Sequence, residues 1–500
     1  MRYIIGIDIG TTNTKAVAFT DEGEVLESAE VSYPIFSDLP GQHELDPEQL
    51  LEAVLSALRG VLGKTASLTG LSGISLSCAM HSLILVDPQG KPLTRAITWA
   101  DQRPASHARA LKESASGRRI YGQTGVPIHA MSPLCKLLWL KADEPELFGR
   151  AARYISIKEY LWWRLFGEYK IDHSIASATG MLDIRSFEWC AEALEVTGVG
   201  AGQLSELVPC TYSKPWTGSS TPGVSSFNLQ RLGLPEGLPF IIGSSDGCLA
   251  NLGSGAIRPG ETALTIGTSG AIRMTAPAPE YDVRERIFSY ILTEQHYVCG
   301  GATNNGGNVI QWYAEGILGK KISEAGVLDH WEKEADLVPP GCEGLVFLPY
   351  LRGERAPVWD ADAKGVFFGV QSVHTQRHFM RAILEGISYS LYQVGASLEE
   401  TLGPIQHIYA SGGFTRSKTW LQLVADVFCK KVDVTGVADA SAIGAAMMGF
   451  YALGIIKDLE ASARWVKVVE RYEPDEGRHA VYRENFAIFT ELYSRLKDLM

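Results

Sequence analysis

The chain has 500 residues, too many for one hydrophobic core of ordinary size, so we expect two or three domains that share an interface. Its 57 acidic and 45 basic side chains give a formal net charge of −12, which argues against a sequence-independent grip on nucleic acid. The eight cysteines are scattered without a CxxC pair, and we interpret them as small apolar side chains, not as disulfides or metal ligands.

No targeting or membrane segment is visible in the sequence. The N-terminus lacks a basic stretch followed by an apolar run and a cleavage site. The longest uncharged run, which starts at Ala440, is short for a membrane span and rich in Gly and Ala, so it predicts a closely packed core helix. We therefore expect a cytoplasmic protein with no nucleic-acid or membrane partner, and a homodimer is compatible with these features.

The first 62 residues predict an antiparallel meander followed by a helix. The runs YIIGID, TKAVAF and EVLESAEVSY are short, rich in β-formers and separated by turn residues. Asp46 can then cap a helix and Pro47 suits its first position. Because strands and helices continue to alternate as far as the helical run PLCKLLWL, the pattern predicts an α/β fold.

The opening motif recurs in the second half of the chain. Ile9-Gly10-Thr11-Thr12 aligns with Ile266-Gly267-Thr268-Ser269, and each set joins two apolar strands. Four matches can arise by chance, since these are common hairpin residues. Without a long polar linker between the halves, we predict two domains facing each other across a cleft, over residues 1–242 and 243–500.

The first hairpin tip has the chemistry of a phosphate site. Gly10, Thr11 and Thr12 offer backbone N–H groups and hydroxyls to one small volume. Asp8, at the strand end before them, would suit Mg²⁺ or its waters, with Lys15 nearby as a point charge. The alternative interpretation makes Asp8 a turn-capping residue and the threonines ordinary strand formers.

Three further segments combine a strand end with glycine. Two of them suit contact with a nucleotide: Gly412-Gly413 and the run NNGGNVIQW. The alternative for Gly412-Gly413 is a plain strand-to-helix loop, and the alternative for NNGGNVIQW is an ordinary helix start. Asp246 ends the apolar run FIIGSSD, where a carboxylate can accept a proton from a substrate hydroxyl that attacks phosphorus. The alternative interpretation is that Asp246 is a turn residue before Gly247.

Together these features resemble the FGGY carbohydrate kinases, of the actin, hexokinase and Hsp70 superfamily, over essentially the whole chain. One family signature is complete between Gly365 and Glu385. A second, from Met131, fits through Leu140 but has Ala142 where a polar residue is usual. The resemblance implies two actin/hexokinase-like (ribonuclease H-like) domains and transfer of phosphate from ATP, with Mg²⁺, to a small sugar or sugar acid.

The resemblance also implies residue roles. Asp246 matches the catalytic base, and Asp8 inherits the contact to Mg²⁺. Ser417 stands where family members often have Asn. The residues that match ATP-contacting positions are Gly10, Thr11, Thr12, Asn13, Lys15, Gly267, Thr268, Gly307, Gln311, Gly413 and Ser417.

The sugar pocket is implied by two segments, SCAMHSLILVD and TWADQR. Met80-His81 stand where the glycerol-phosphorylating branch has an Arg-Glu pair. Ser82 stands where xylulose kinases have Gly. The chain therefore most resembles the branch that forms 6-phospho-D-gluconate. The substrate candidates are Met80, His81, Ser82, Trp99, Asp101, Arg103 and Asp246.

A gluconate carboxylate needs a cationic or N–H-rich partner. Arg103, His129 and Lys158 are candidates, although Arg103 can instead pair with Asp101, His129 can pack in a loop, and Lys158 can lie at a helix start. Two other functions stay open: a D-xylulose kinase, and a sugar-binding regulator that has lost transfer. The presence of Asp8 and Asp246 disfavours the regulator, and the absence of a separate C-terminal domain disfavours an Hsp70-like ATPase.

Overall fold

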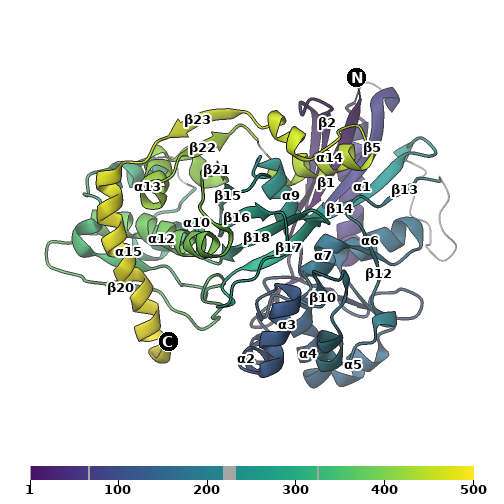
Figure 1. The fold of residues 1–500 in the computed structure, drawn as a ribbon, viewed down its shortest axis with the longest axis horizontal. Helices are drawn as coiled ribbons and strands as arrows, with labels where there is room; N and C mark the ends of the chain where they lie inside the picture. The colour runs from purple at the N-terminus through teal and green to yellow at the C-terminus, as the bar shows by residue number, and fades with distance from the viewer. Residues whose placement is uncertain (1, 66–67, 218–231, 324–325, 438) are drawn as a thin grey trace.

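The computed structural model describes residues 2–65, 68–217, 232–323, 326–437 and 439–500. Two lobes lie side by side, each built around one mixed sheet (Figure 1). The first sheet has the strand order β13–β14–β5–β1–β2–β3. In that order, its strands are Ser213–Pro215, Pro239–Ser245, Leu71–Cys78, Tyr3–Ile9, Asn13–Thr20 and Val25–Ser32.

The second sheet has the order β17–β18–β16–β15–β21–β22–β23. Its strands are Phe288–Thr293, His296–Thr303, Gly270–Ala276, Glu261–Ile266, His407–Ser411, Val432–Thr435 and Val468–Tyr472. The two sheets repeat one topology. Strand β1 pairs antiparallel with β2 and parallel with β5, and β15 pairs in the same way with β16 and β21.

This repeat agrees with the predicted alignment of the two hairpins, since β1–β2 and β15–β16 occupy equivalent places in their sheets. Strand β14 continues the first sheet to Ser245 and is followed directly by helix α9 (Asp246–Gly253). The predicted domain boundary at residues 242–243 falls inside β14 and stays a prediction.

Helices cover both sheets and build the outer parts of each lobe (Figure 1). Besides α9, the helices α1–α8 and α10–α15 are Pro47–Leu62, Ala105–Lys112, Ala115–Thr124, Pro133–Asp143, Pro145–Arg150, Ile157–Phe166, His173–Ser177, Ala191–Thr197, Gly307–Trp312, Val327–Asp336, Gln376–Leu402, Lys418–Phe428, Ala440–Ala452 and Glu476–Leu496. Five two-stranded ribbons complete the described structure: β4/β7 (Glu44–Leu45, Ala96–Ile97), β6/β8 (Ile84–Val86, Arg153–Ile155), β9/β12 (Lys170–Asp172, Glu206–Val208), β10/β11 (Leu182–Asp183, Glu188–Trp189) and β19/β20 (Val346–Leu348, Val366–Phe368).

Helix α1 begins as its sequence predicts. The Asp46 carboxylate accepts the N–H of Glu48 at 2.8 Å, which satisfies one of the free donors of the first turn, and Pro47 occupies the first helical position. The leucines of its apolar face are buried against β2 and β3. Capping and periodicity are local properties, which explains why the sequence alone predicted this element.

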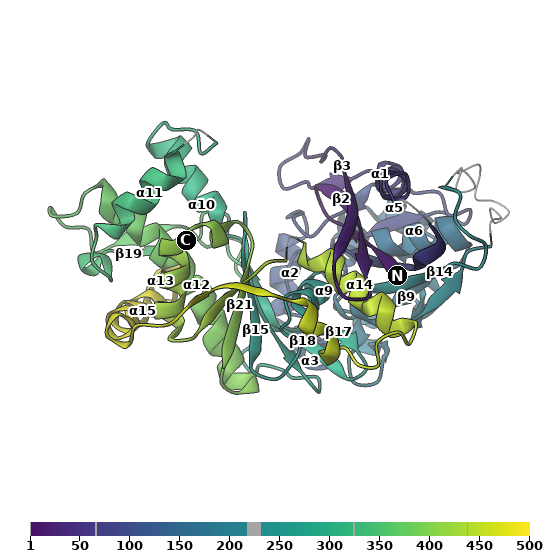
Figure 2. The same ribbon diagram turned by 90° about the horizontal axis from the view of Figure 1, so that it is seen from above.

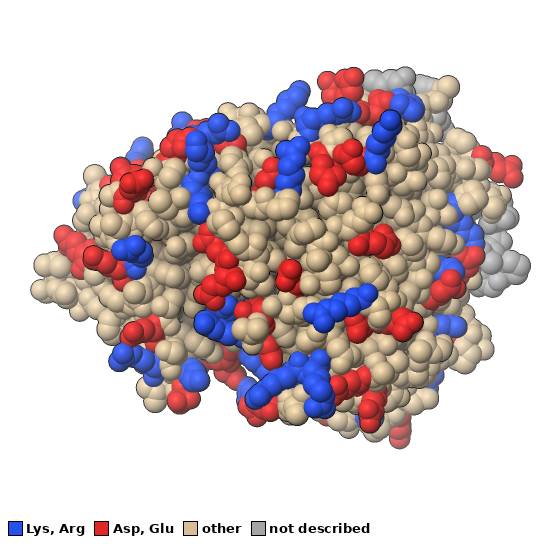
Figure 3. All heavy atoms as spheres, viewed as in Figure 1, with Lys and Arg blue, Asp and Glu red and all other residues tan. Residues whose placement is uncertain are grey.

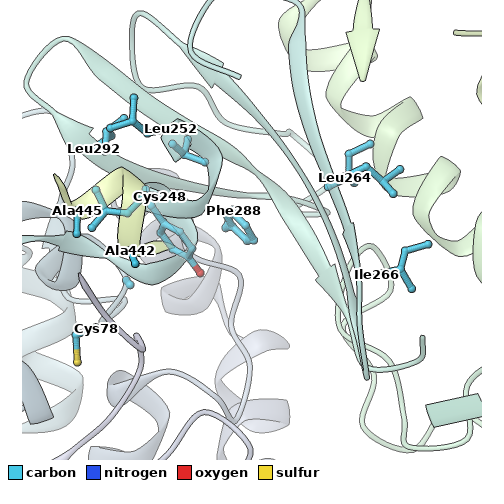
Figure 4. Packing of buried hydrophobic residues seen from close by; sticks show 14 of the residues in the cluster. Cys78, Cys248, Leu252, Leu264, Ile266, Phe288, Leu292, Ala442 and Ala445 are labelled. Atoms are coloured by element: carbon cyan, nitrogen blue, oxygen red, sulfur yellow. The ribbon is translucent and has the colours of Figure 1, made fainter. Parts of the chain in front are cut away.

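Helices α9 and α14 join the two lobes. Seen from above, α14 lies beside β1 of the first lobe (Figure 2), and α9 contacts both α14 and the strands β16 and β17 of the second sheet. Cys248 and Leu252 of α9 lie close to Ala442 and Ala445 of α14 (Figure 4). Helix α14 contains the uncharged run and packs on β1 and β5, as expected for a closely packed core helix. No helix among the described residues is long and apolar enough to span a membrane.

Acidic and basic side chains alternate over the face of the molecule shown in Figure 3. Many form surface pairs of opposite charge, such as Arg119 with Glu192 and Arg471 with Asp433. On this face, therefore, the negative net charge of the chain is distributed and not gathered into one patch.

Candidate active site

A cavity of about 410 Å³ lies where the two sheets face each other. Thr11 and Thr12, from the tip of the β1–β2 hairpin, line one part of it, and Ser269, from the tip of the β15–β16 hairpin, lines another. Asp246, the first residue of α9, lines the same cavity. The structure thus brings the two repeated motifs and the predicted base to one site.

The first hairpin tip is held by two aromatic residues. The Tyr33 hydroxyl donates to the carbonyl of Gly10 at 2.6 Å, and the Trp99 indole N–H donates to the Thr11 hydroxyl at 3.0 Å. Asn13 donates to Glu30 at 2.6 Å. Since these contacts fix the tip, its free N–H groups are oriented before any ligand arrives.

The second hairpin tip packs against the start of α10. Gly267 N–H donates to Ser269 at 2.8 Å and Gly307 N–H donates to the Gly267 carbonyl at 2.8 Å. A Cβ atom on Gly307 would lie 2.8 Å from that carbonyl, so the approach requires glycine. Gly267 and Thr268 are exposed, and they are therefore open to a ligand.

The third glycine cluster, Gly412-Gly413, also lies at the end of β15. Gly412 has φ +94°, and a Cβ atom there would lie 2.6 Å from the Ile266 carbonyl at the end of β15. Gly413 faces open space, while the Ser417 hydroxyl caps α13 by accepting the N–H of Trp420 at 3.1 Å. Gln311, on α10, is exposed and donates to Glu315. Three glycine-rich segments thus converge at the end of β15.

Asp8 is half-buried at the end of β1 and accepts the Ser77 hydroxyl at 2.7 Å. Burial, together with the nearby carboxylates of Asp439 and Asp246, raises its pKa to about 7. Lys15 forms its ion pair with Asp439 at 3.2 Å. In the second repeat Thr265 takes the place of Asp8 and shares a hydrogen bond with Ser411 at 2.8 Å, so the carboxylate belongs to one half only.

Asp246 is half-buried at the N-terminus of α9, and Oδ1 accepts the N–H of Gly247 at 2.7 Å. Burial raises its pKa, while the Arg273 guanidinium opposes that rise. A carboxylate in this position has an accessible oxygen in the cavity and a nearby cation that favours its charged form. These are the properties that a general base requires.

Besides Asp246, three of the predicted substrate residues line the cavity: Met80, His81 and Trp99. His81 Nδ1–H donates to the carbonyl of Ala178 at 2.7 Å, and its Nε2 accepts the Tyr290 hydroxyl at 3.3 Å. Burial and the nearby Lys136 lower the pKa of His81 to about 3, so the ring is neutral. His81 therefore offers the cavity a neutral imidazole.

The structure places the other predicted substrate residues, and the three candidates for binding a carboxylate, outside this cavity. Ser82 accepts the N–H of Ile157 at 3.0 Å, and Arg103 pairs with the buried Asp101 at 2.7 Å. Lys158 is buried and donates to Asp172 at 2.7 Å, and the ring of His129 lies edge-on to Trp359. None of Arg103, His129 and Lys158 is on the wall of this cavity, within the residues described.

Two charged residues of the cavity wall were not predicted from the sequence: Arg273 and Arg355. Arg273 is a charged residue in the otherwise apolar second strand of the predicted β15–β16 hairpin, which was a usable signal. Arg355 follows Glu354 in an irregular segment with no periodic pattern, so nothing local marked it.

The fold is duplicated, and a glycine-rich hairpin from each half lies at one cavity with the Asp246 carboxylate. This arrangement defines the class of two-domain kinases that phosphorylate small hydroxyl compounds. The chain belongs to the FGGY family of carbohydrate kinases. The family's N-terminal domain matches residues 3–253 and its C-terminal domain matches residues 262–453. The protein is therefore a carbohydrate kinase, and the predicted two-domain α/β fold is confirmed.

Individual relatives cover the whole chain. It is 42% identical to the gluconokinase of Bacillus subtilis (strain 168), over 99% of this chain and 96% of that protein, and 29% identical to the xylulose kinase of the same strain, over 100% and 98%. Crystal structures titled gluconate kinase and xylulose kinase, both from Lactobacillus acidophilus, each superpose with a TM-score of 0.92 at 33% identity. The alignments cover 99% of this chain in both cases, and 98% and 99% of those chains.

Proposed function

We propose that the protein transfers the γ-phosphate of ATP to a sugar acid, D-gluconate, to form 6-phospho-D-gluconate, with Asp246 as general base. The observation that carries the proposal is the position of Asp246 in one cavity with both hairpin tips. A substrate hydroxyl beside this carboxylate would lie between the base and the phosphate-binding loops.

In the proposed reaction, the Asp246 carboxylate accepts the proton of the substrate hydroxyl as that oxygen attacks the γ-phosphorus. The new O–P bond forms as the bond from phosphorus to the bridging oxygen of ADP breaks. Hairpin N–H groups at Thr11–Thr12 and Thr268–Ser269 would stabilise charge on the phosphate oxygens. Closure of the lobes would exclude water and so suppress ATP hydrolysis.

The residues present fit a magnesium ion held jointly with the phosphates. No group of three or more Asp, Glu, His or Cys side chains suited to hold a metal occurs among the described residues. Mg²⁺ typically uses one or two carboxylates together with water and substrate phosphates, so one carboxylate is enough. Asp8 is the proposed residue, because Asp439 and Asp246 oppose its ionisation and a cation would relieve that repulsion. When bound, Mg²⁺ would neutralise phosphate charge.

D-Gluconate is preferred over D-xylulose as the proposed substrate for two reasons. Identity is 42% and 40% to two gluconokinases of the genus Bacillus, against 29% to the xylulose kinases of Staphylococcus epidermidis and Bacillus subtilis and 33% to that of Lactobacillus acidophilus. In addition, two arginines line the cavity beside a single acidic residue, which favours an anionic substrate. The two similar crystal structures do not separate the choices, since their titles differ and their TM-scores are equal.

The test is an assay of ADP release with purified protein, Mg-ATP and one acceptor at a time: D-gluconate, D-xylulose, L-ribulose, glycerol or none. The proposal expects kcat/KM for D-gluconate to exceed that for every other acceptor. A preference for D-xylulose would keep the kinase and reject the sugar acid. No release above the acceptor-free control with any of them would favour a sugar-binding regulator.

A further inference from the structure

The cavity wall carries two arginines, Arg273 and Arg355, that form no salt bridge with any residue the structure describes. Elsewhere in the described structure, arginines with low exposure are paired with carboxylates at short distances: Arg286 with Asp282 at 2.7 Å and Arg381 with Glu385 at 2.9 Å. Within the same described residues, Arg273 and Arg355 form no ion pair, and each has a buried Nε atom without a hydrogen-bond partner. Unpaired buried charge is costly, so these two residues need an explanation.

Arg273 extends from β16 over the N-terminus of α9. A Cβ atom on Gly247 would lie 3.3 Å from its Nε and 3.4 Å from its Nη2, so the absence of a side chain at Gly247 leaves room for the guanidinium. No hydrogen bond from its side chain occurs among the described residues, and burial lowers its pKa. The planar donor fork of Arg273 is therefore free to receive a ligand in the cavity.

Arg355 is held in place but forms no salt bridge among the described residues. Its Nη2 donates to the Thr303 carbonyl at 2.9 Å, and its guanidinium carbon lies 4.7 Å from the centre of the Trp99 ring. The adjacent Glu354 directs its carboxylate elsewhere, to the backbone N–H groups of Asn304 and Arg355 at 2.5 and 2.8 Å. Arg355 is thus a fixed cation on the cavity wall.

Among the side chains that line the cavity, Arg273 and Arg355 are cations, Asp246 is a carboxylate and His81 is neutral. The buried Glu354 carboxylate, behind this wall, favours the charged form of Arg355. A neutral ketose would leave the donor fork of Arg273 without an acceptor. A sugar acid would supply one, because a guanidinium binds a carboxylate through two parallel hydrogen bonds.

We propose that Arg273, supported by Arg355, forms the subsite that receives the carboxylate group of the acid substrate. This inference deepens the proposed function and rests on it in taking a sugar acid as the acceptor. The same guanidinium could instead contact the γ-phosphate of ATP, and the experiment has to separate these two anions.

The experiment compares Arg273→Met with Arg273→Lys and the wild type, using D-gluconate and D-glucitol as acceptors. D-Glucitol has the same carbon chain with a neutral CH₂OH in place of the carboxylate. We expect Arg273→Met to lower kcat/KM for D-gluconate on the order of 100-fold, mainly through KM, while D-glucitol changes by less than about threefold. Arg273→Lys keeps the charge near Asp246 but loses the fork, so its KM for D-gluconate should fall between the other two.

Binding without turnover gives a second measurement. D-Gluconate without ATP should raise the melting temperature of the wild type and leave that of Arg273→Met unchanged. The free variant should melt close to the wild type, because the Arg273 side chain makes no hydrogen bond or salt bridge among the described residues and contributes only a longer-range attraction to Asp246. The exposed Arg119→Met, which removes a surface pair with Glu192 and a hydrogen bond to Ser116, is the matched control and should behave as wild type in every measurement.

The outcomes separate the two proposals. If Arg273→Met lowers kcat/KM equally for D-gluconate and D-glucitol and raises the KM for ATP, Arg273 contacts the phosphate and the inference is overturned. An unchanged KM for D-gluconate in Arg273→Met would overturn it as well. If the wild type does not phosphorylate D-gluconate yet binds it through Arg273, the proposed function fails and the carboxylate subsite stands. Neither turnover nor binding of D-gluconate by the wild type would overturn both.

Discussion

A Cβ atom on Gly444 of α14 would lie 2.0 Å from the carbonyl oxygen of Leu249 in α9, so the two helices touch backbone to backbone. The contact is reciprocal, because a Cβ atom on Gly253 of α9 would lie 1.9 Å from the carbonyl of Ala440. Helix α9 begins at Asp246, and α14 is capped by Asp439. The glycine contact therefore sets the distance between two of the carboxylates around the site.

Replacing Gly444 by Ala should push α9 and α14 apart. Because the obstacle is backbone, the added methyl cannot be accommodated by a side-chain rotation, and we expect a loss of stability of about 1–3 kcal/mol. A displaced Asp246 should also lower kcat by about tenfold or more. Thermal unfolding and the ADP-release assay measure the two effects.

The control is Gly122→Ala on α3, where the added Cβ atom meets nothing within 4 Å and the residue is exposed. This change should leave activity unaltered and raise stability by up to about 1 kcal/mol. If Gly444→Ala behaved like its control, the close contact between the helices would have no role in positioning Asp246.

Asp246→Asn should abolish transfer while nucleotide binding persists. The amide oxygen can still accept the N–H of Gly247, so the start of α9 is retained, but an amide cannot take up the proton of the substrate hydroxyl. We expect kcat to fall by about 10²- to 10⁴-fold, with the dissociation constant for ATP, measured by calorimetry, unchanged within a small factor. Turnover at the wild-type rate would remove Asp246 from the role of base.

Asp8→Asn should weaken the response to magnesium. The Ser77 hydroxyl can donate to an amide oxygen as it does to the carboxylate, so the strand end is preserved and only the charge is lost. The Mg²⁺ concentration for half-maximal activity should rise by about tenfold or more, read from a titration at saturating ATP. Asp183→Asn, in a remote turn where Oδ1 accepts the N–H of Arg185, is the control. The same magnesium curve for both variants would make Asp8 structural.

The buried Lys136 should make stability depend on pH. It donates to the carbonyls of His81 and Met131, on the cavity wall, and burial lowers its pKa to about 7, from an ordinary value of 10.5. Between these values the unfolded chain carries the proton and the folded chain does not, so the free energy of unfolding rises with pH in that range.

Lys136→Met lacks this titration. Relative to the variant, the wild type should gain up to about 1.4 kcal/mol for each pH unit between pH 7 and 10, and nothing below pH 6. Urea unfolding of both proteins at pH 6, 8 and 9 measures the difference. A constant difference at the three pH values would show that Lys136 keeps its proton in the folded protein.

Much of the site was predictable because its signals are local. Alternating apolar residues and turn glycines identified both hairpins, and the carboxylates that follow strands identified Asp8 and Asp246 as candidates. The residues predicted to bind the substrate carboxylate, in contrast, do not lie on the cavity wall within the described residues. Arg103 lies two residues from its partner Asp101 but also pairs with Glu44, and Lys158 pairs with Asp172, so neither charge lines the cavity.

The order of residues was enough to predict the duplicated hairpins, the helix caps and the resemblance to a kinase family, because hydrophobic period, turn chemistry and motif spacing act over a few residues. The folded chain was needed to show which charges form salt bridges and which face the cavity. Arg103, Arg273 and Arg355 are the same amino acid, and they differ only in what the folded chain places beside them. Electrostatic pairing depends on distance in space, and the order of residues along the chain does not encode that distance locally.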